Sequence, residues 1–233
     1  EAVEEEAREG ALLGVARRAA ARLGLHHVQE VDERLRRALL AAAEPDVRPA
    51  LGEVGAGLTL SPNATRALIG LGLGETLERA ADEPHTGLTR HWRDARVLTR
   101  SERGAAIRAK YGAPYLQIHR ADLLEMLAQA SAREAAIEVH TAHALVGIDT
   151  QGERSVLQFE NGARVSADVV LGCDGLKSAV RNALFGETPA QFSGYVAWRA
   201  LVPASALAVP LDPPAQLFIG IERMFMRYLV RHG

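Results

Sequence analysis

The sequence predicts an α/β protein, and three patterns along the chain carry that prediction. An apolar run at 169–171 leads through a glycine-rich turn at 172–175 into a predicted helix at 177–185. A buried strand, a glycine-rich turn and a helix in this order are typical of open α/β sheets, whose ligands bind at the carboxyl ends of the strands. Leucines at helical spacing predict another helix from about Ala121. Asn-Gly between two alternating runs predicts a hairpin over 155–167.

Composition narrows the class of protein. The chain has 233 residues, 48% of them hydrophobic and 24% charged, and a formal net charge of −2. These values are those of an ordinary globular protein, and they argue against a general nucleic-acid or membrane-surface binder. No apolar stretch approaches the roughly 18 residues of a membrane span. Cys173 is the single cysteine, which fits a reducing compartment. We therefore expect a cytoplasmic enzyme or binding domain with no nucleic-acid or membrane partner.

Residues 1–50 differ from the rest of the chain. They are rich in Ala, Arg, Leu and Glu, and helices are predicted over 12–25 and 31–43. A dinucleotide-binding unit would open with an apolar strand and Gly-x-Gly-x-x-Gly. Here only Gly10 and Gly14 lie in the right region, and an acidic stretch precedes them. Two interpretations of residues 1–50 stay open. The segment is either a degenerate nucleotide-binding unit or an unrelated or out-of-frame helical segment, and we expect the second.

The pattern sharpens from Leu51 onward. Ser61 can cap a helix whose first position is Pro62, and the apolar face that follows ends at Gly72. Further along, 95–100 and 105–108 are predicted as two strands.

The stretch 117–127 places Arg120 just before the helix predicted from Ala121 and Asp122 within its first turn. Taken alone, this pair predicts a local ion pair at a helix start. Residues 137–148 then predict one long strand or two short ones. His140 and His143 would face opposite sides of such a strand, so we expect no metal site.

The most specific motif is Asp174-Gly175-x-x-Ser178-x-x-Arg181 after the apolar run. A carboxylate at a strand end can hold a ribityl or ribose hydroxyl. We expect Ser178 and Arg181 to hold the turn together, or Arg181 to reach the face of a cofactor. The alternative is an ordinary strand–turn–helix junction. Cys173 is expected to be a small buried filler.

This motif resembles the Asp-Gly fingerprint of class A FAD-dependent aromatic-ring monooxygenases, most closely the salicylate hydroxylase-like branch. Glu53–Leu68 and Gly194–Pro203 resemble other stretches of that family, and the resemblance covers about 51–233. It implies an incomplete, Rossmann-like FAD-binding domain with part of a β-rich substrate domain. The implied division is a helical segment at 1–50, a FAD-binding body with inserted strands at 51–190, and a truncated substrate-domain sheet at 191–233. A hairpin over 216–230 would belong to that sheet.

The resemblance also implies which residues form the site. Arg120 would reach the FAD pyrophosphate or the flavin edge, because a guanidinium gives bidentate, permanently charged contacts to phosphate oxygens. Tyr195 and Arg199 would touch an aromatic acid substrate, or they are cross-strand packing residues. The residues implied to contact FAD are Val54, Gly55, Ala56, Arg120, Asp174 and Gly175.

For an intact family member, the resemblance implies NAD(P)H-dependent hydroxylation of a phenolic or benzoate-type substrate by O2 through a flavin C4a-hydroperoxide. The sequence has neither a sound N-terminal Gly-x-Gly-x-x-Gly nor the family's C-terminal Gly-Asp-Ala-Ala-His. The alternative expectation is therefore an inactive fragment or remnant with weak or no FAD binding. No general base for the substrate can be named from the sequence.

Overall fold

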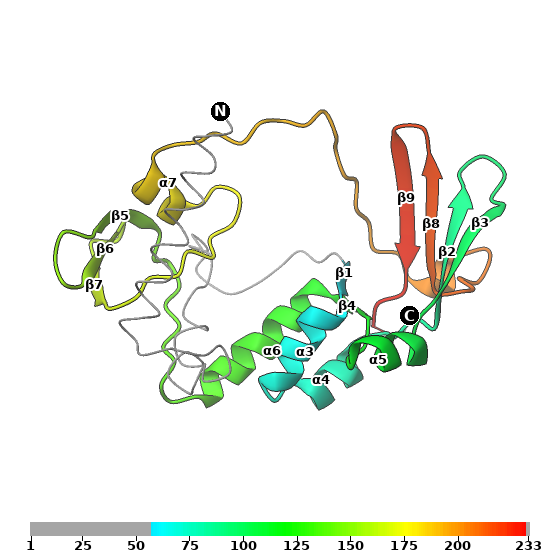
Figure 1. Cartoon of the computed structure of the whole chain (residues 1–233), viewed down its shortest axis with the longest axis horizontal. Helices are drawn as coiled ribbons and strands as arrows, with labels where there is room; N and C mark the ends of the chain where they lie inside the picture. Colours follow the sequence, from blue (N-terminus) through cyan, green and yellow to red (C-terminus); the bar gives the residue numbers. More distant parts are fainter. Residues whose placement is uncertain (1–56, 232–233) are drawn as a thin grey trace. The chain divides into compact units, whose positions relative to one another are not determined.

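The computed structural model describes residues 57–231 (Figure 1). The helices predicted at 12–25 and 31–43, and the candidate residues Val54, Gly55 and Ala56, lie outside these residues. Within them the chain forms two compact units. We call residues 57–130 together with 194–231 the sheet–helix unit, and residues 131–193 the meander unit.

The sheet–helix unit contains most of the regular structure. Its described helices are α3 (Pro62–Gly70), α4 (Gly74–Ala80), α5 (Ala105–Tyr111), most of α6 (Arg120–Arg133) and a 3₁₀ turn at Ala204–Ala206. Its described strands are β1 (Gly57–Leu60), β2 (Thr86–His91), β3 (Val97–Glu102), β4 (Leu116–His119), β8 (Ala215–Gly220) and β9 (Arg223–Tyr228).

Two predicted helix starts are confirmed, and the helix predicted from 177 begins at Ala179 as α7 (Ala179–Phe185). Helix α3 begins at Pro62 with Ser61 in the N-cap position, although the Ser61 side chain makes no capping hydrogen bond. Proline suits this position because its missing N–H would have no helical partner there. Helix α6 begins at Arg120, one residue before the predicted start. The α/β class is thus confirmed in the part of the chain that the structure describes.

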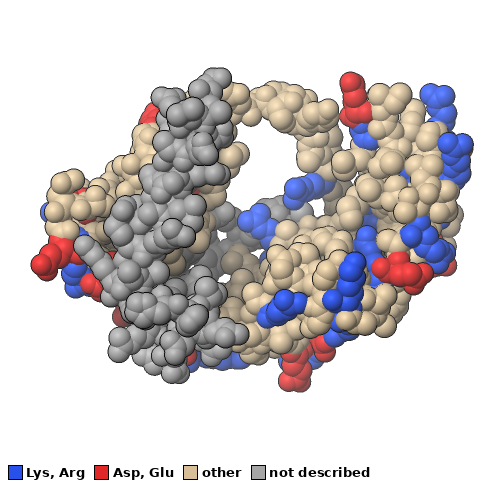
Figure 2. Space-filling view, viewed as in Figure 1, with Lys and Arg blue, Asp and Glu red and all other residues tan. Residues whose placement is uncertain are grey.

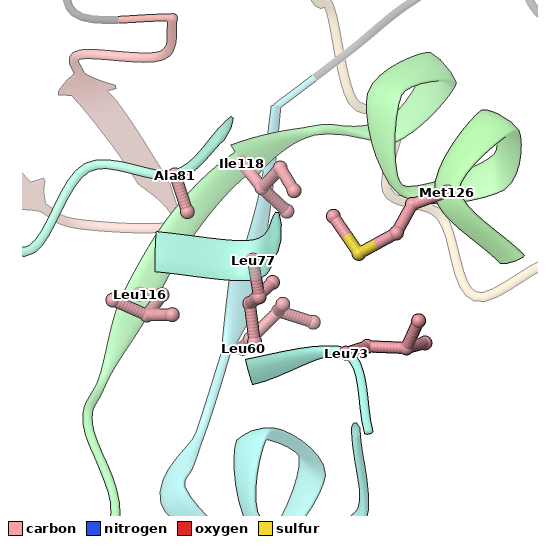
Figure 3. Packing of buried hydrophobic residues seen from close by; sticks show 7 residues of the cluster. All are labelled: Leu60, Leu73, Leu77, Ala81, Leu116, Ile118 and Met126. Atoms are coloured by element: carbon pink, nitrogen blue, oxygen red, sulfur yellow. The ribbon is translucent and has the colours of Figure 1, made fainter. Parts of the chain in front are cut away.

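The core of this unit lies between the β1–β4 pair and the helices. The two strands are antiparallel, with Gly57 opposite His119 and Leu60 opposite Leu116. Figure 3 shows the side chains that gather on one side of this pair. The buried members of the cluster are Leu60, Leu73, Leu77, Ala81, Leu116, Ile118 and Met126. Burial of these apolar side chains is the main source of the unit's stability.

A second sheet joins segments that lie far apart in the sequence. Its strand order is β3-β2-β8-β9, and Figure 1 shows β8 and β9 beside β2 and β3. Strands β2 and β8 are parallel, whereas the other two pairs are antiparallel. The predicted hairpin over 216–230 is confirmed as β8 and β9. The sheet therefore combines strands from the predicted 51–190 and 191–233 parts, whose boundary remains a prediction.

The meander unit contains three antiparallel strands and one helix. The strands are β5 (Leu145–Asp149), β6 (Ser155–Phe159) and β7 (Arg164–Ala167), and the helix is α7 (Ala179–Phe185). The hairpin predicted from Asn161-Gly162 is confirmed, because β6 and β7 pair around that turn.

The segment at 105–108 was wrongly predicted as a strand, because it forms the start of α5. Ala, Arg and Lys favour helices, and Gly112 ends this helix in the left-handed conformation. Tertiary contacts also hold it. Arg108 Nη2 lies 2.7 Å from a carboxylate oxygen of Glu83 and 3.1 Å from one of Glu78. Hydrogen bonding to Glu83 in particular raises the pKa of Arg108.

Two other strand predictions fail, one of them in part and the other entirely. Only Leu145–Asp149 of the predicted 137–148 stretch forms a strand. The apolar run at 169–171 forms no strand among the described residues, and Val169 and Leu171 are each 39% exposed. An apolar run becomes a strand only where a neighbouring strand supplies hydrogen-bond partners. No described strand pairs with this run.

The buried cluster predicts the effect of one core substitution. Leu77 is fully buried at the centre of the cluster, so Leu77→Ala should lower the free energy of unfolding by about 2–5 kcal/mol. Urea unfolding followed by the fluorescence of Trp92 and Trp198, which lie in the same unit, measures the change. Ile69→Ala is the control, because Ile69 is 43% exposed on α3. Equal losses in the two variants would contradict this assignment of the core.

Candidate functional site

The Asp-Gly turn places Asp174 at the start of helix α7. The Asp174 carboxylate accepts a hydrogen bond from the Ser178 hydroxyl and another, at 3.0 Å, from the backbone N–H of Val180. Gly175 has a φ of +72°, a left-handed conformation that residues with a Cβ rarely adopt. The glycine thus lets the chain turn back so that Asp174 reaches the N–H groups of the helix.

These contacts keep Asp174 ionised. Partial burial raises its pKa, but hydrogen bonds from Ser178 and from backbone N–H groups outweigh the burial and bring the pKa below its ordinary value. Asp174 is only half-buried, so a ligand hydroxyl can still reach its carboxylate while it holds the turn.

Ser178 and Arg181 complete the turn. Ser178 is the N-cap of α7, and its hydroxyl accepts a hydrogen bond of 2.9 Å from the backbone N–H of Arg181. The Arg181 guanidinium donates to the carbonyl of Leu176 at 2.9 Å. Of the two roles predicted for Arg181, the structure shows the one that holds the turn together.

The prediction that Cys173 is buried was wrong, because it is exposed in a segment without a described strand partner.

Arg120 lies at one end of the β1–β4 pair. It is the exposed first residue of α6 and directly follows His119, the ladder partner of Gly57. The chain before Gly57 is the predicted flavin-contacting stretch 54–56. Antiparallel pairing therefore places Gly57, the first residue of β1, opposite His119, the residue before Arg120.

Arg231, beyond the end of β9, holds the start of α6. Its guanidinium donates to both carboxylate oxygens of Asp122, with the Nε–Oδ2 distance at 2.7 Å. Its Nη2 atom also lies 3.4 Å from Nδ1 of His119. The hydrogen bonds from Arg231 lower the pKa of Asp122. The partner shown for Asp122 therefore comes from the far end of the chain, whereas the local helix-start pair was the sequence expectation.

Tyr228, near the end of β9, meets the start of β1. A Cβ added at Gly57 would lie 2.5 Å from Cε2 of Tyr228, so this contact requires glycine. Burial raises the pKa of the Tyr228 phenol, Arg199 lowers it, and Tyr115 raises it further. Arg199 thus lies close enough to Tyr228 to affect the pKa of its phenol.

The predicted substrate residues lie in an exposed segment. Tyr195 is 68% exposed and Arg199 is also exposed, and no strand forms over 194–203. They make no cross-strand pair in the described chain, and their contact with a substrate remains a prediction.

We expected His140 and His143 to face opposite sides of a strand, but the two rings lie close together. Their ring centroids lie 5.3 Å apart, because this part of the predicted strand is irregular. Among residues 57–231, no three His, Cys, Asp or Glu side chains are gathered as metal ligands. On the face shown in Figure 2, basic groups are scattered among uncharged atoms with acidic groups beside several of them.

Arg120 and Asp174 each suit one part of FAD in chemical character. FAD carries an anionic pyrophosphate and several sugar and ribityl hydroxyls. The permanent cation of Arg120 suits the phosphates, and the ionised Asp174 suits a hydroxyl donor. The two side chains belong to different units, and each is described within its own unit.

Sequence reasoning missed the contacts that Arg231, Tyr228 and His119 make around the start of α6 and β1. His119 and Arg120 stand together in the sequence, but nothing there indicates that His119 accepts a hydrogen bond, at 3.2 Å, from the N–H of Ala121. Arg231 and Asp122 are 109 residues apart, and no local pattern links positions at that distance. Covariation between the two positions is the signal that could have found them.

Comparison with known proteins gives a consistent family. The FAD binding domain family matches residues 52–213. The chain is 40% identical over 187 residues to a 3-amino-4-hydroxybenzoate 2-monooxygenase of Streptomyces platensis, covering 78% of this chain and 45% of that protein. It is 36% identical over 185 residues to a 3-hydroxybenzoate 6-hydroxylase of Klebsiella oxytoca, with coverage of 78% and 46%. The chain thus spans about half the length of these curated relatives.

Solved structures agree with this result. A salicylate hydroxylase in a substrate complex superposes with a TM-score of 0.62 at 27% identity, covering 76% of this chain and 46% of that one. Klebsiella pneumoniae HpxO, solved with FAD and uric acid, has a TM-score of 0.61 at 22% identity, covering 78% and 46%, and shows a shared fold alone. In the described part of the chain, no helix has the length and apolar character that crossing a membrane requires.

The Asp174 contacts predict a pH-dependent loss of stability. Asp174→Ala removes a carboxylate that accepts hydrogen bonds from Ser178 and from the first turn of α7, and it should cost about 1 kcal/mol at pH 7. Because the folded pKa of Asp174 lies below its ordinary value of 3.8, its stabilisation is present above that pH and is lost as the pH falls through the folded pKa. The wild type and the variant should therefore converge in strong acid.

Hydrogen exchange of the α7 amides at neutral and acidic pH measures this difference. Asp168→Ala is the matched control, since it removes another carboxylate of the same unit, one that is exposed and pairs with Arg154. A difference between wild type and Asp174→Ala that persists unchanged at low pH would contradict a role for the ionised group.

Proposed function

Because the chain belongs to the FAD binding domain family, we propose that it forms the flavin-binding part of an NAD(P)H-dependent monooxygenase that hydroxylates an aromatic acid. The observation that carries this proposal is the 40% identity over 187 residues to a 3-amino-4-hydroxybenzoate 2-monooxygenase. The names of several relatives share one kind of substrate, a hydroxylated aromatic carboxylate, in benzoate and nicotinate forms. This shared chemistry supports a hydroxybenzoate-type substrate.

Two of the chain's own side chains support the binding of FAD. Arg120 is exposed at the start of α6 and can offer a bidentate, permanently charged contact to the pyrophosphate. Asp174 is ionised and rigidly held in its turn, so it can orient a hydroxyl of the ribityl chain or the ribose. Gly175 belongs to the same turn. Val54, Gly55 and Ala56 are proposed as the stretch beside the isoalloxazine.

Bound FAD would supply the redox chemistry, with NADH or NADPH as the reductant and O2 as the oxygen source. The chain's part is to hold the cofactor, to orient the aromatic ring and to exclude water from the reaction. Tyr195 and Arg199 are the proposed contacts to the substrate, and a guanidinium suits the carboxylate of an aromatic acid. The single cysteine supports a cytoplasmic setting for this reaction.

The first test is whether the chain retains FAD, and which residue holds it. After incubation with FAD and desalting, the protein should keep a flavin absorbance spectrum. Arg120→Gln should weaken FAD binding about 10- to 100-fold, because it removes a charge-assisted contact to phosphate worth about 1.5–3 kcal/mol. Titration of flavin fluorescence measures the dissociation constant.

Arg79→Gln is the control for that titration, because it removes an exposed arginine that pairs with Glu75 on α4. It should leave FAD affinity unchanged. If the two variants bind FAD equally, Arg120 has no special role.

The second test concerns the reaction. The chain loaded with FAD should oxidise NADH or NADPH faster when 3-hydroxybenzoate is added than when cyclohexanecarboxylate, a non-aromatic acid, is added. Absorbance at the nicotinamide band follows the reaction, and chromatography of the aromatic product shows whether oxygen was inserted. A chain that binds FAD but is not stimulated by aromatic acids would contradict the proposed hydroxylase while supporting the cofactor.

A further inference from the structure

The chain beyond β9 contacts both sides of Arg120. Arg231 binds the carboxylate of Asp122, two residues after Arg120, through two parallel N–H donors. The same guanidinium lies 3.4 Å from Nδ1 of His119, the residue immediately before Arg120. One side chain therefore contacts the side chains of residues on either side of the proposed phosphate-binding residue.

We propose that Arg231 is a positioning residue for FAD binding, which fixes the β4–α6 junction so that Arg120 is presented to the cofactor. This inference rests on the proposed function, since it assigns a purpose to a contact near the proposed FAD residue. Arg231 itself need not touch FAD.

The geometry of the junction explains why such a residue is needed. The first N–H groups of a helix have no partners within the helix. Here the N–H of Ala121 donates to Nδ1 of His119 at 3.2 Å. His119 is buried and only 5% exposed, so its ring is a firm support for the first turn. Arg231 contacts both that ring nitrogen and the carboxylate of Asp122 in the first turn. It therefore connects His119 to the turn that His119 supports.

The requirement is specific for arginine. A guanidinium is planar and can offer two parallel N–H groups to one carboxylate while another N–H points elsewhere. A lysine ammonium is a point charge and cannot hold Asp122 in this fixed geometry. The pKa of Asp122 is lowered chiefly by the hydrogen bonds from Arg231, in agreement with this contact.

A second contact brings the end of β9 to the same end of the β1–β4 pair. The ring of Tyr228 fills the space where a Cβ of Gly57 would lie. Gly57 faces His119 in the ladder. Strand β9 is in turn paired with β8 over six positions. The four-stranded sheet is thus joined to the proposed cofactor end by two contacts. Tyr228 packs against β1, and Arg231 binds the first turn of α6.

A purely structural ion pair would behave differently from a positioning residue. It would stabilise the fold, and its loss would weaken FAD binding to the same extent whether or not Arg120 is present. A positioning residue acts through Arg120, so its loss should matter little once Arg120 is gone. Non-additivity between the two positions therefore distinguishes the two roles.

The test is a double-mutant cycle on FAD affinity in the whole chain. The variants are Arg231→Gln, Arg120→Gln and the double variant, and FAD is titrated against each by flavin fluorescence. Arg231→Gln should weaken binding about 10-fold in the wild-type background and less than about 2-fold in the Arg120→Gln background. Arg231→Lys should restore only part of the affinity. Arg79→Gln again serves as the ion-pair control, and thermal unfolding is recorded for every variant.

Each outcome decides the inference. Effects of Arg231→Gln and Arg120→Gln that add in the double variant would overturn the positioning role and leave the proposed function intact. Full recovery of affinity with Arg231→Lys would overturn the requirement for a bidentate guanidinium. If the wild-type chain binds no FAD, the proposed function fails, and the role of Arg231 towards FAD fails with it. Variants that unfold are identified by their melting curves, and Arg231→Lys then carries the cycle with Arg120→Gln.

Discussion

The antiparallel pairing of β1 with β4 is the constraint on which the sheet–helix unit depends. It aligns Leu60 with Leu116 and so builds the wall against which α4 and α6 bury their apolar side chains. The same register places Gly57 opposite His119, one residue before Arg120. Stability and the proposed site therefore share one element. Displacement of this pair by one residue would turn the core-facing side chains outward and would also move the start of α6.

Two carboxylates illustrate how local structure prepares the proposed cofactor contacts. Asp174 accepts from Ser178 and from the N–H of Val180, and Asp122 accepts from Arg231. Both have a pKa below the ordinary value, so both are anionic at neutral pH. Neither is a free surface charge. Asp174 presents a half-buried carboxylate from a fixed turn, and Asp122 anchors the first turn of α6 beside Arg120.

The sequence predicted elements well where a local signal was strong. Asn161-Gly162 between two alternating runs predicted the β6–β7 hairpin, and Ser61-Pro62 predicted the start of α3. The Asp-Gly motif identified the family, and the match to residues 52–213 confirms it. Predictions failed where a residue pattern fits two structures. The segment at 105–108 is helical because alanine-rich chain favours helix and Arg108 is held by Glu78 and Glu83.

By itself, the sequence determined the α/β class, the family and the FAD cofactor that the family carries, because these depend on short motifs with fixed spacing. It also identified Arg120 and Asp174 as the candidate side chains. Only the tertiary structure decided what surrounds them. The contacts of Arg231 with Asp122 and of Tyr228 with Gly57 join residues more than 100 positions apart. Such contacts arise when strands pair and a core closes, and no local pattern encodes them.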